Sequence, residues 1–214
     1  MWLLTRSYLI IVPMLFIIAC SNKESKPVDN KGIIATKDSS KIKAPGKNEN
    51  PYVIVDVSPM DISYYPADYP ILKMTKAINT EPLARIIYSR PHLQGRQLFH
   101  NLLKYGEPWR LGANESTELD LYTDALIQDR KIKAGRYILY CIPEPDNWTI
   151  IINSNIDSWG LHPDSAKDIA RFIIPIKQTA NHLEYYTMIF EKKGDGAELL
   201  MAWDNLEARL PFRF

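Results

Sequence analysis

The strongest fold signal in this 214-residue sequence is the stretch Glu207-Ala208-Arg209-Leu210-Pro211-Phe212-Arg213-Phe214. Apolar side chains fall at every second position from Ala208 to Phe214, and charged side chains occupy most of the positions between them. Successive side chains of a strand point to opposite faces, so this spacing predicts a strand with one buried face and one exposed face. The same alternation recurs over residues 118–121 and is typical of antiparallel sheets.

Further runs of β-type sequence follow one another from residue 84 onward, separated by turn-forming residues at 145–147, 193–196 and 204–205. One short helix is predicted over Arg96–Tyr105, with Gly106 as its end signal. Strands without an alternating helix pattern predict a mainly β domain over residues 84–214, an antiparallel two-sheet β-sandwich of jelly-roll or immunoglobulin-like type with one short helix. The predicted strands are Ala84–Ser89, Glu118–Tyr122, Gly135–Ile142, Trp148–Asn153, Ile169–Ile176, Glu184–Glu191, Ala197–Trp203 and Glu207–Phe214.

The first residues carry an export signal. Arg6 is followed by the apolar run Tyr8–Ile18 and then by Ala19-Cys20, an order typical of a bacterial lipoprotein signal peptide. A transmembrane helix is the alternative, but the run is only about 11 residues long where a spanning helix needs about 20. We therefore predict a signal peptide over 1–19 and lipidation, including palmitate-type acylation, of Cys20.

Two further segments separate this signal from the β domain. Residues 20–50 contain the lipidated cysteine and a polar run rich in Lys, Ser and Asn, and this composition predicts a disordered tether. Residues 51–83 are rich in Pro and Tyr and predict an irregular arm. Ser21 directly after the cysteine favours the outer membrane, so we expect a protein of the bacterial envelope whose lipid on Cys20 holds the domain in the periplasm.

Charge and cysteine content exclude several classes of function. The chain has 26 Lys and Arg against 25 Asp and Glu, and a balanced charge argues against a nucleic-acid partner. With Cys20 lipidated, Cys141 stands alone in an apolar run and is interpreted as a small buried side chain. The four histidines show no ligand-type spacing, so neither a metal site nor a cofactor is predicted.

One polar constellation lies between the first two predicted strands of the β domain. Arginine suits carboxylate or phosphate groups, and tryptophan offers a flat face to a sugar ring or a guanidinium group. Glycines between them allow a close approach of the backbone to a ligand. The candidate binding residues are Arg90, Arg96, Trp109, Arg110, Asn114 and Glu115, joined by Trp159 from a later loop.

Three interpretations of this constellation remain open. In the structural one, the arginines pair internally with Glu107, Glu115 or Asp120 and fix a long loop. In the binding one, the domain is a non-catalytic binding or interaction module for an anionic or sugar-like ligand, or for an envelope protein or glycan. In the catalytic one, a periplasmic hydrolase or isomerase uses Glu115 as general base, Arg110 to hold an anionic substrate, and His100 or His162 as proton partner.

Several short motifs resemble a known family. Tyr88-Ser89-Arg90-Pro91, the run Trp109–Glu115 and Ala202-Trp203-Asp204 are similar to the signature of the bacterial domain-of-unknown-function family 2911. The resemblance covers roughly residues 56–214 and implies an exported, often lipid-anchored envelope protein with a mostly β domain. It implies no activity and therefore carries over no catalytic residue. Departures from the family pattern occur at His100, where glycine is usual, and over Leu161–Pro163.

Overall fold

The computed structural model of the protein describes residues 58–214. The predicted signal peptide (1–19), the tether (20–50) and Cys20 all lie outside the described residues. Among the described residues, no helix has both the length and the apolar character needed to cross a membrane.

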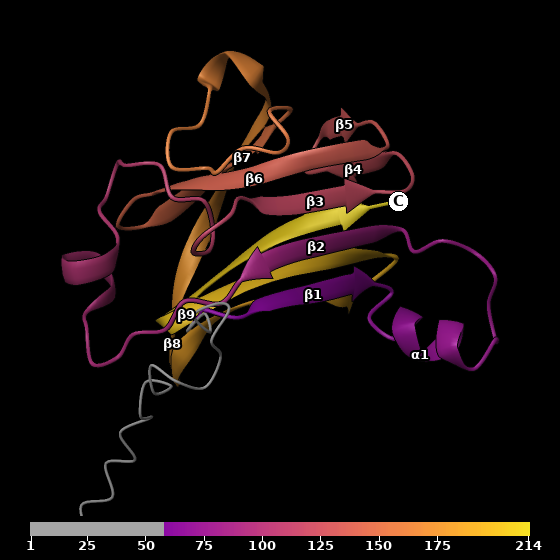
Figure 1. Cartoon of the computed structure of the whole chain (residues 1–214), viewed down its shortest axis with the longest axis horizontal. Helices are drawn as coiled ribbons and strands as arrows, with labels where there is room; N and C mark the ends of the chain where they lie inside the picture. Colours follow the sequence, from indigo (N-terminus) through magenta and orange to yellow (C-terminus); the bar gives the residue numbers. More distant parts are fainter. Residues whose placement is uncertain (1–57) are drawn as a thin grey trace, which may run out of the picture. The chain divides into compact units, whose positions relative to one another are not determined.

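Nine strands form one hydrogen-bonded order, β1-β2-β3-β6-β7-β8-β9-β4-β5, in which every pair of neighbours is antiparallel (Figure 1). The prediction of a mainly β, antiparallel domain is confirmed. The elements are β1 (Met60–Tyr65), α1 (Tyr69–Met74), β2 (Ala84–Ser89), the π-helical turn η1 (Leu98–Leu102), β3 (Thr117–Leu121), β4 (Ala125–Ile127), β5 (Arg130–Ile132), β6 (Gly135–Pro143), β7 (Asn147–Asn153), the 3-10 turn η2 (Ser165–Lys167), β8 (Asp168–Lys193) and β9 (Gly196–Arg213).

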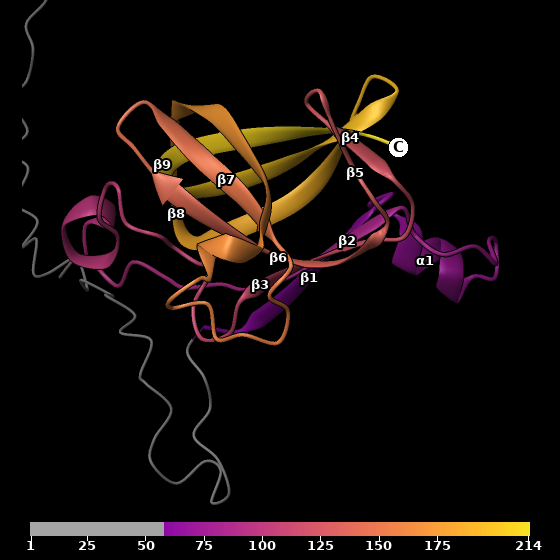
Figure 2. The same cartoon turned by 90° about the horizontal axis from the view of Figure 1, so that it is seen from above.

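The long strand β8 makes the sheet curl back on itself. Its first part pairs with β7 and the rest pairs with β9, and its later half crosses the inner side of β1 and β2 (Figure 2). There the Phe190 N–H donates to Ser63 Oγ at 2.9 Å, and the Tyr88 and Tyr186 rings meet edge to face with centroids 5.8 Å apart. Two parts of one sheet thus face each other across the core, which is compatible with the predicted two-layer sandwich.

The structure corrects the predicted break near residue 204. The runs 169–176 and 184–191 belong to one strand, β8. The run 197–203 and residues 207–213 of the last run belong to β9. Asp204 has a positive φ of 56°, and the β8–β9 register shifts between Gln178 and Thr187. The extra residues of this irregularity lie on β8, and β9 continues through Asp204-Asn205 where a turn was predicted. Aspartate tolerates the left-handed conformation that lets the strand bend there without reversing.

Two local predictions also need correction. The helix predicted over Arg96–Tyr105 is reduced to the five-residue turn η1, in which Phe99 leaves helical backbone angles. The segment 51–83, predicted as an irregular arm, contributes the edge strand β1 and the helix α1. Its prolines are compatible with both elements because Pro66 follows β1 and Pro70 lies in the first turn of α1, where no N–H is needed.

The alternating apolar residues predicted from the sequence form part of the buried core. Ala208, Leu210 and Phe212 are all buried, as the spacing of the final stretch predicts. At the centre of the core, the Trp109 ring contacts Trp148, Tyr186 and Trp203 at centroid distances of 5.8, 4.8 and 5.8 Å. This aromatic cluster connects the loop before β3 with β7, β8 and β9, and it fixes the base of the candidate site.

Candidate functional site

The loop that carries Trp109 and Arg110 is attached firmly to β6. The Trp109 N–H donates to Cys141 O, and the Cys141 N–H donates to Trp109 O, each at 2.7 Å. The indole N–H of Trp109 donates to Gly112 O at 3.1 Å. Because neighbouring side chains of an extended segment point in opposite directions, the burial of Trp109 leaves Arg110 half-buried at the surface.

Arg110 lies over the exposed ring of Trp159. The guanidinium carbon is 6.0 Å from the ring centroid, and Nη1 is 3.5 Å from the Trp159 carbonyl oxygen. Within residues 58–214, no carboxylate lies at ion-pair distance from Arg110. Partial burial lowers the pKa of Arg110 and the nearby Glu115 carboxylate opposes this effect, yet an arginine stays charged at any physiological pH.

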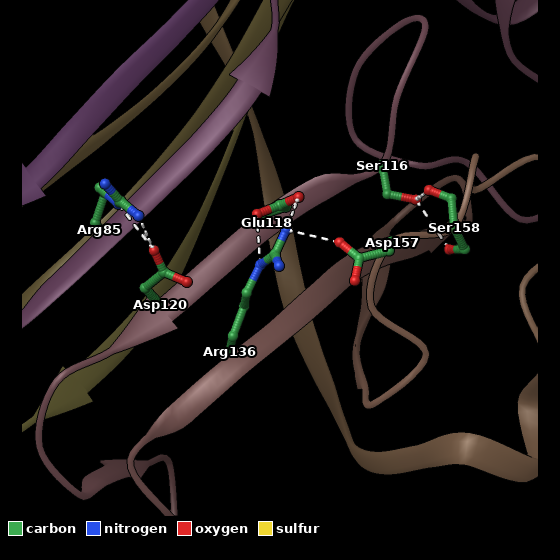
Figure 3. A network of polar contacts seen from close by, with 7 residues as sticks. All are labelled: Arg85, Ser116, Glu118, Asp120, Arg136, Asp157 and Ser158. Atoms are coloured by element: carbon green, nitrogen blue, oxygen red, sulfur yellow. Dashed lines mark hydrogen bonds and ion pairs between the residues drawn. The ribbon is translucent and has the colours of Figure 1, made fainter.

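The loop that carries Trp159 is held by a polar network from β3 and β6 (Figure 3). Ser116 Oγ donates to Ser158 O at 2.7 Å, and Arg136 forms an ion pair of 3.0 Å with Asp157. Arg136 also binds both oxygens of Glu118, at 2.9 and 2.7 Å. Gly160 fits closely here, because a Cβ at this position would lie 2.5 Å from Ser116 Oγ. Trp159 is therefore presented from a fixed loop.

A cleft of about 360 Å³ opens beside this pair, and we call it the tryptophan cleft. Trp109 and Trp203 contribute to its apolar lining, together with Leu102, Leu103, Pro108 and Leu161. Its charged lining residues are Lys104, Glu107 and Arg110. Lys104 and Glu107 pair with each other at 3.3 Å. Arg110 is therefore the lining cation that no described carboxylate neutralises at close range.

Two of the predicted site arginines are engaged in contacts within the fold. Arg90 contacts Asp61 at 3.2 Å, Tyr186 O at 3.2 Å and Thr187 Oγ1 at 3.0 Å, and so ties β8 to β1. Arg96 donates to the Leu93 and His92 carbonyl oxygens at 2.9 Å each and closes its own loop. Both side chains are engaged in internal contacts, but their partners are not the predicted Glu107, Glu115 and Asp120.

The residues of the catalytic alternative do not meet in one cleft. Glu115 is exposed on the loop before β3, and neither it nor His162 lines the tryptophan cleft. His100 lines a different cleft, described below. Asn114 adopts a positive φ of 61° in the same loop. Of the predicted binding residues, the structure brings Trp109, Arg110 and Trp159 together around the tryptophan cleft.

Sequence reasoning missed a second cleft, of about 510 Å³, which we call the polar cleft. Its lining includes Gln97, His100, Tyr105, Asp146, Gln178 and Asp204. The sequence signal was present in part, since Pro145-Asp146 and Asp204-Asn205 were interpreted only as turns. Among the described residues, no group of three or more His, Cys, Asp or Glu side chains is placed to hold a metal ion.

Comparison with known proteins gives one result. The family model of the proteins of unknown function DUF2911 matches residues 72–212. No curated protein and no solved structure matches the chain significantly. The matched region contains the strands from β2 to β8, most of β9 and both clefts. Because the match covers well over half of the sequence, the chain belongs to the DUF2911 family.

Proposed function

We propose that the protein is a non-catalytic binding module whose tryptophan cleft takes a small ligand with an apolar body and a carboxylate. The carrying observation is the position of Arg110, which lines the cleft without a carboxylate at ion-pair distance in residues 58–214. A half-buried cation beside apolar walls favours an anionic partner, because a charge-assisted hydrogen bond strengthens where water is excluded.

The shape and lining of the cleft support the same ligand class. Pockets for small ligands are mostly apolar and carry a few placed polar groups that fix orientation. Here Leu102, Pro108 and Leu161 offer apolar surface beside the buried rings of Trp109 and Trp203. Arg110 offers a planar fork of donors suited to the two oxygens of a carboxylate. Stacking on Trp159 restricts the Arg110 side chain before a ligand arrives, and such preorganisation lowers the entropic cost of binding.

Replacing Arg110 with glutamine is expected to weaken carboxylate binding by about 10-fold to 100-fold, because one charge-assisted interaction contributes about 1.5–3 kcal/mol. Full-length protein in detergent would be titrated calorimetrically with 3-phenylpropionate, indole-3-acetate and hexanoate. The amide of 3-phenylpropionate is the uncharged counterpart, and it also reports partition into the micelle. We expect the acid to bind and the amide to bind at least 10-fold more weakly.

Lys104→Gln is the matched control at the same cleft. Because Lys104 is already paired with Glu107, its replacement is expected to change the affinity by less than about 3-fold, as for an exposed ion pair. Equal binding of acid and amide, an Arg110→Gln variant with unchanged affinity, or no binding of any of the three acids would contradict the proposal.

We further propose that a lipid on Cys20 holds the module at the outer membrane, with the domain in the periplasm. The proposal rests on the sequence order around Ala19-Cys20 and on the family resemblance. Cys20→Ser is expected to release the protein from the membrane fraction and to abolish the incorporation of labelled palmitate. A variant that still sediments with the membranes would overturn the anchor and would leave the proposed ligand site unaffected.

A further inference from the structure

The polar cleft lies where the bulge of the β8–β9 pair meets two other segments. Asp204 and Asn205 come from β9, and Gln178 comes from the end of the regular part of β8. η1 and Tyr105 form another wall, and the β6–β7 turn adds Asp146. The register shift of the two long strands thus places side chains from four separate segments around one volume of about 510 Å³.

The polar side chains of this cleft are available to a ligand. Gln97, Asp146, Gln178 and Asn205 are exposed, and their side chains make no hydrogen bond to another residue of the described chain. Asp204 has one partner, His182 Nδ1 at 2.8 Å. Amides and carboxylates that converge without internal partners offer both donors and acceptors, which is the pattern that a ligand with several hydroxyl groups requires.

An aromatic ring stands beside these groups. Tyr105 is 45% exposed, and its ring stacks on Phe99 with centroids 4.2 Å apart and planes 12° apart. The stack holds one face of Tyr105 against Phe99 and fixes the orientation of the other. A flat, fixed aromatic face suits the C–H surface of a sugar ring, because such a surface is apolar while the hydroxyl groups lie around its edge.

The charges of the cleft restrict the ligand further. No lysine or arginine of the described chain lines it, whereas the carboxylates of Asp146 and Asp204 do. Carboxylates repel phosphates and uronic acids and accept hydrogen bonds from hydroxyl groups. From this combination we propose that the polar cleft is a binding site for a neutral saccharide, separate from the carboxylate site of the tryptophan cleft.

The proposal is tested by saturation-transfer NMR on full-length protein in detergent, with maltose, cellobiose, mannobiose and diacetylchitobiose as probes. At least one neutral disaccharide is expected to receive saturation, and Tyr105→Ala is expected to reduce that transfer by about 10-fold, consistent with the loss of one stacked ring. Glucuronate serves as the anionic counterpart and is expected to receive none, because Asp146 and Asp204 repel it. Glucosamine serves as the cationic counterpart, because transfer to it alone would indicate a site for cations and not for neutral sugars.

Two further variants keep the test decisive. Gln178→Ala removes one exposed polar group without disturbing the Phe99–Tyr105 stack, and is expected to weaken binding by about 3-fold to 10-fold, the value of one neutral hydrogen bond. Arg110→Gln is expected to leave saccharide binding unchanged, so failure of the carboxylate site and failure of this site are distinguishable. Absence of transfer to every neutral probe, transfer to glucosamine alone, or transfer that survives Tyr105→Ala would overturn the proposal.

Discussion

Trp148→Ala is expected to lower the free energy of unfolding by about 3–5 kcal/mol, the cost typical of deleting a large buried aromatic side chain. Trp148 is fully buried in β7 and meets Trp109 edge to face at 5.8 Å. Its removal leaves a void next to Trp109, whose other neighbours, Tyr186 and Trp203, are also fully buried. A small domain has only about 5–15 kcal/mol in total, so the variant is expected to be marginally stable at 37 °C.

Urea unfolding followed by far-UV circular dichroism measures this loss, because that signal does not depend on the tryptophan removed. Trp159→Ala is the matched control. Its ring is 56% exposed, so we expect a change within about 0.5 kcal/mol.

The indole N–H of Trp148 has no hydrogen-bond partner among the described residues. Trp148→Phe should therefore destabilise the fold less than Trp148→Ala does. Phenylalanine fills more of the space than alanine, and no hydrogen bond of the indole is lost in either variant. A loss below about 1 kcal/mol for the alanine variant would contradict the central position of Trp148 in the core.

The strands could be predicted because burial imposes a period of two on their side chains. The alternation of Glu118 to Leu121 and of Ala208 to Phe212 appears in the structure as alternating burial. Continuity of strands could not be predicted in the same way. Asp204-Asn205 has the composition of a turn, and only the pairing of β9 with β8 on both sides of it shows that the strand continues.

The candidate site was predicted less completely, because identical residue types take different roles according to their tertiary partners. Arg90, Arg96 and Arg110 share one short segment of sequence. Arg90 pairs with Asp61, and Arg96 donates to backbone carbonyl oxygens. Arg110 instead lies over a tryptophan ring from a loop nearly 50 residues later. No local pattern indicates which arginine finds an acid, since that depends on how the sheet curls. The polar cleft was missed for the same reason, because its four walls are distant in sequence.

Between pH 10 and pH 12 the free energy of unfolding is expected to fall by about 4 kcal/mol through two buried tyrosines, Tyr88 and Tyr140. Burial raises the pKa of Tyr88 to about 12. Burial, together with a hydrogen bond to Asp168, raises the pKa of Tyr140 to about 12. In the unfolded chain a tyrosine titrates near pH 10. Above pH 10 the unfolded state therefore releases protons that the native state still holds, and stability decreases as pH rises.

Each shift of about two pKa units corresponds to about 2–3 kcal/mol. The stabilisation that each neutral, buried tyrosine gives to the fold is fully present below pH 10 and is lost as the pH rises through 12. The two contributions are expected to add, because Tyr88 belongs to the main core whereas Tyr140 is buried outside it. Urea unfolding at pH 8, 10, 11 and 12 measures the loss. Tyr140→Phe and Tyr88→Phe should each reduce the fall between pH 10 and 12 by about 2 kcal/mol. The double variant should keep the part due to Tyr186, whose pKa burial also raises. An unfolding free energy that stays constant across this range would show that neither phenol is held neutral by the fold.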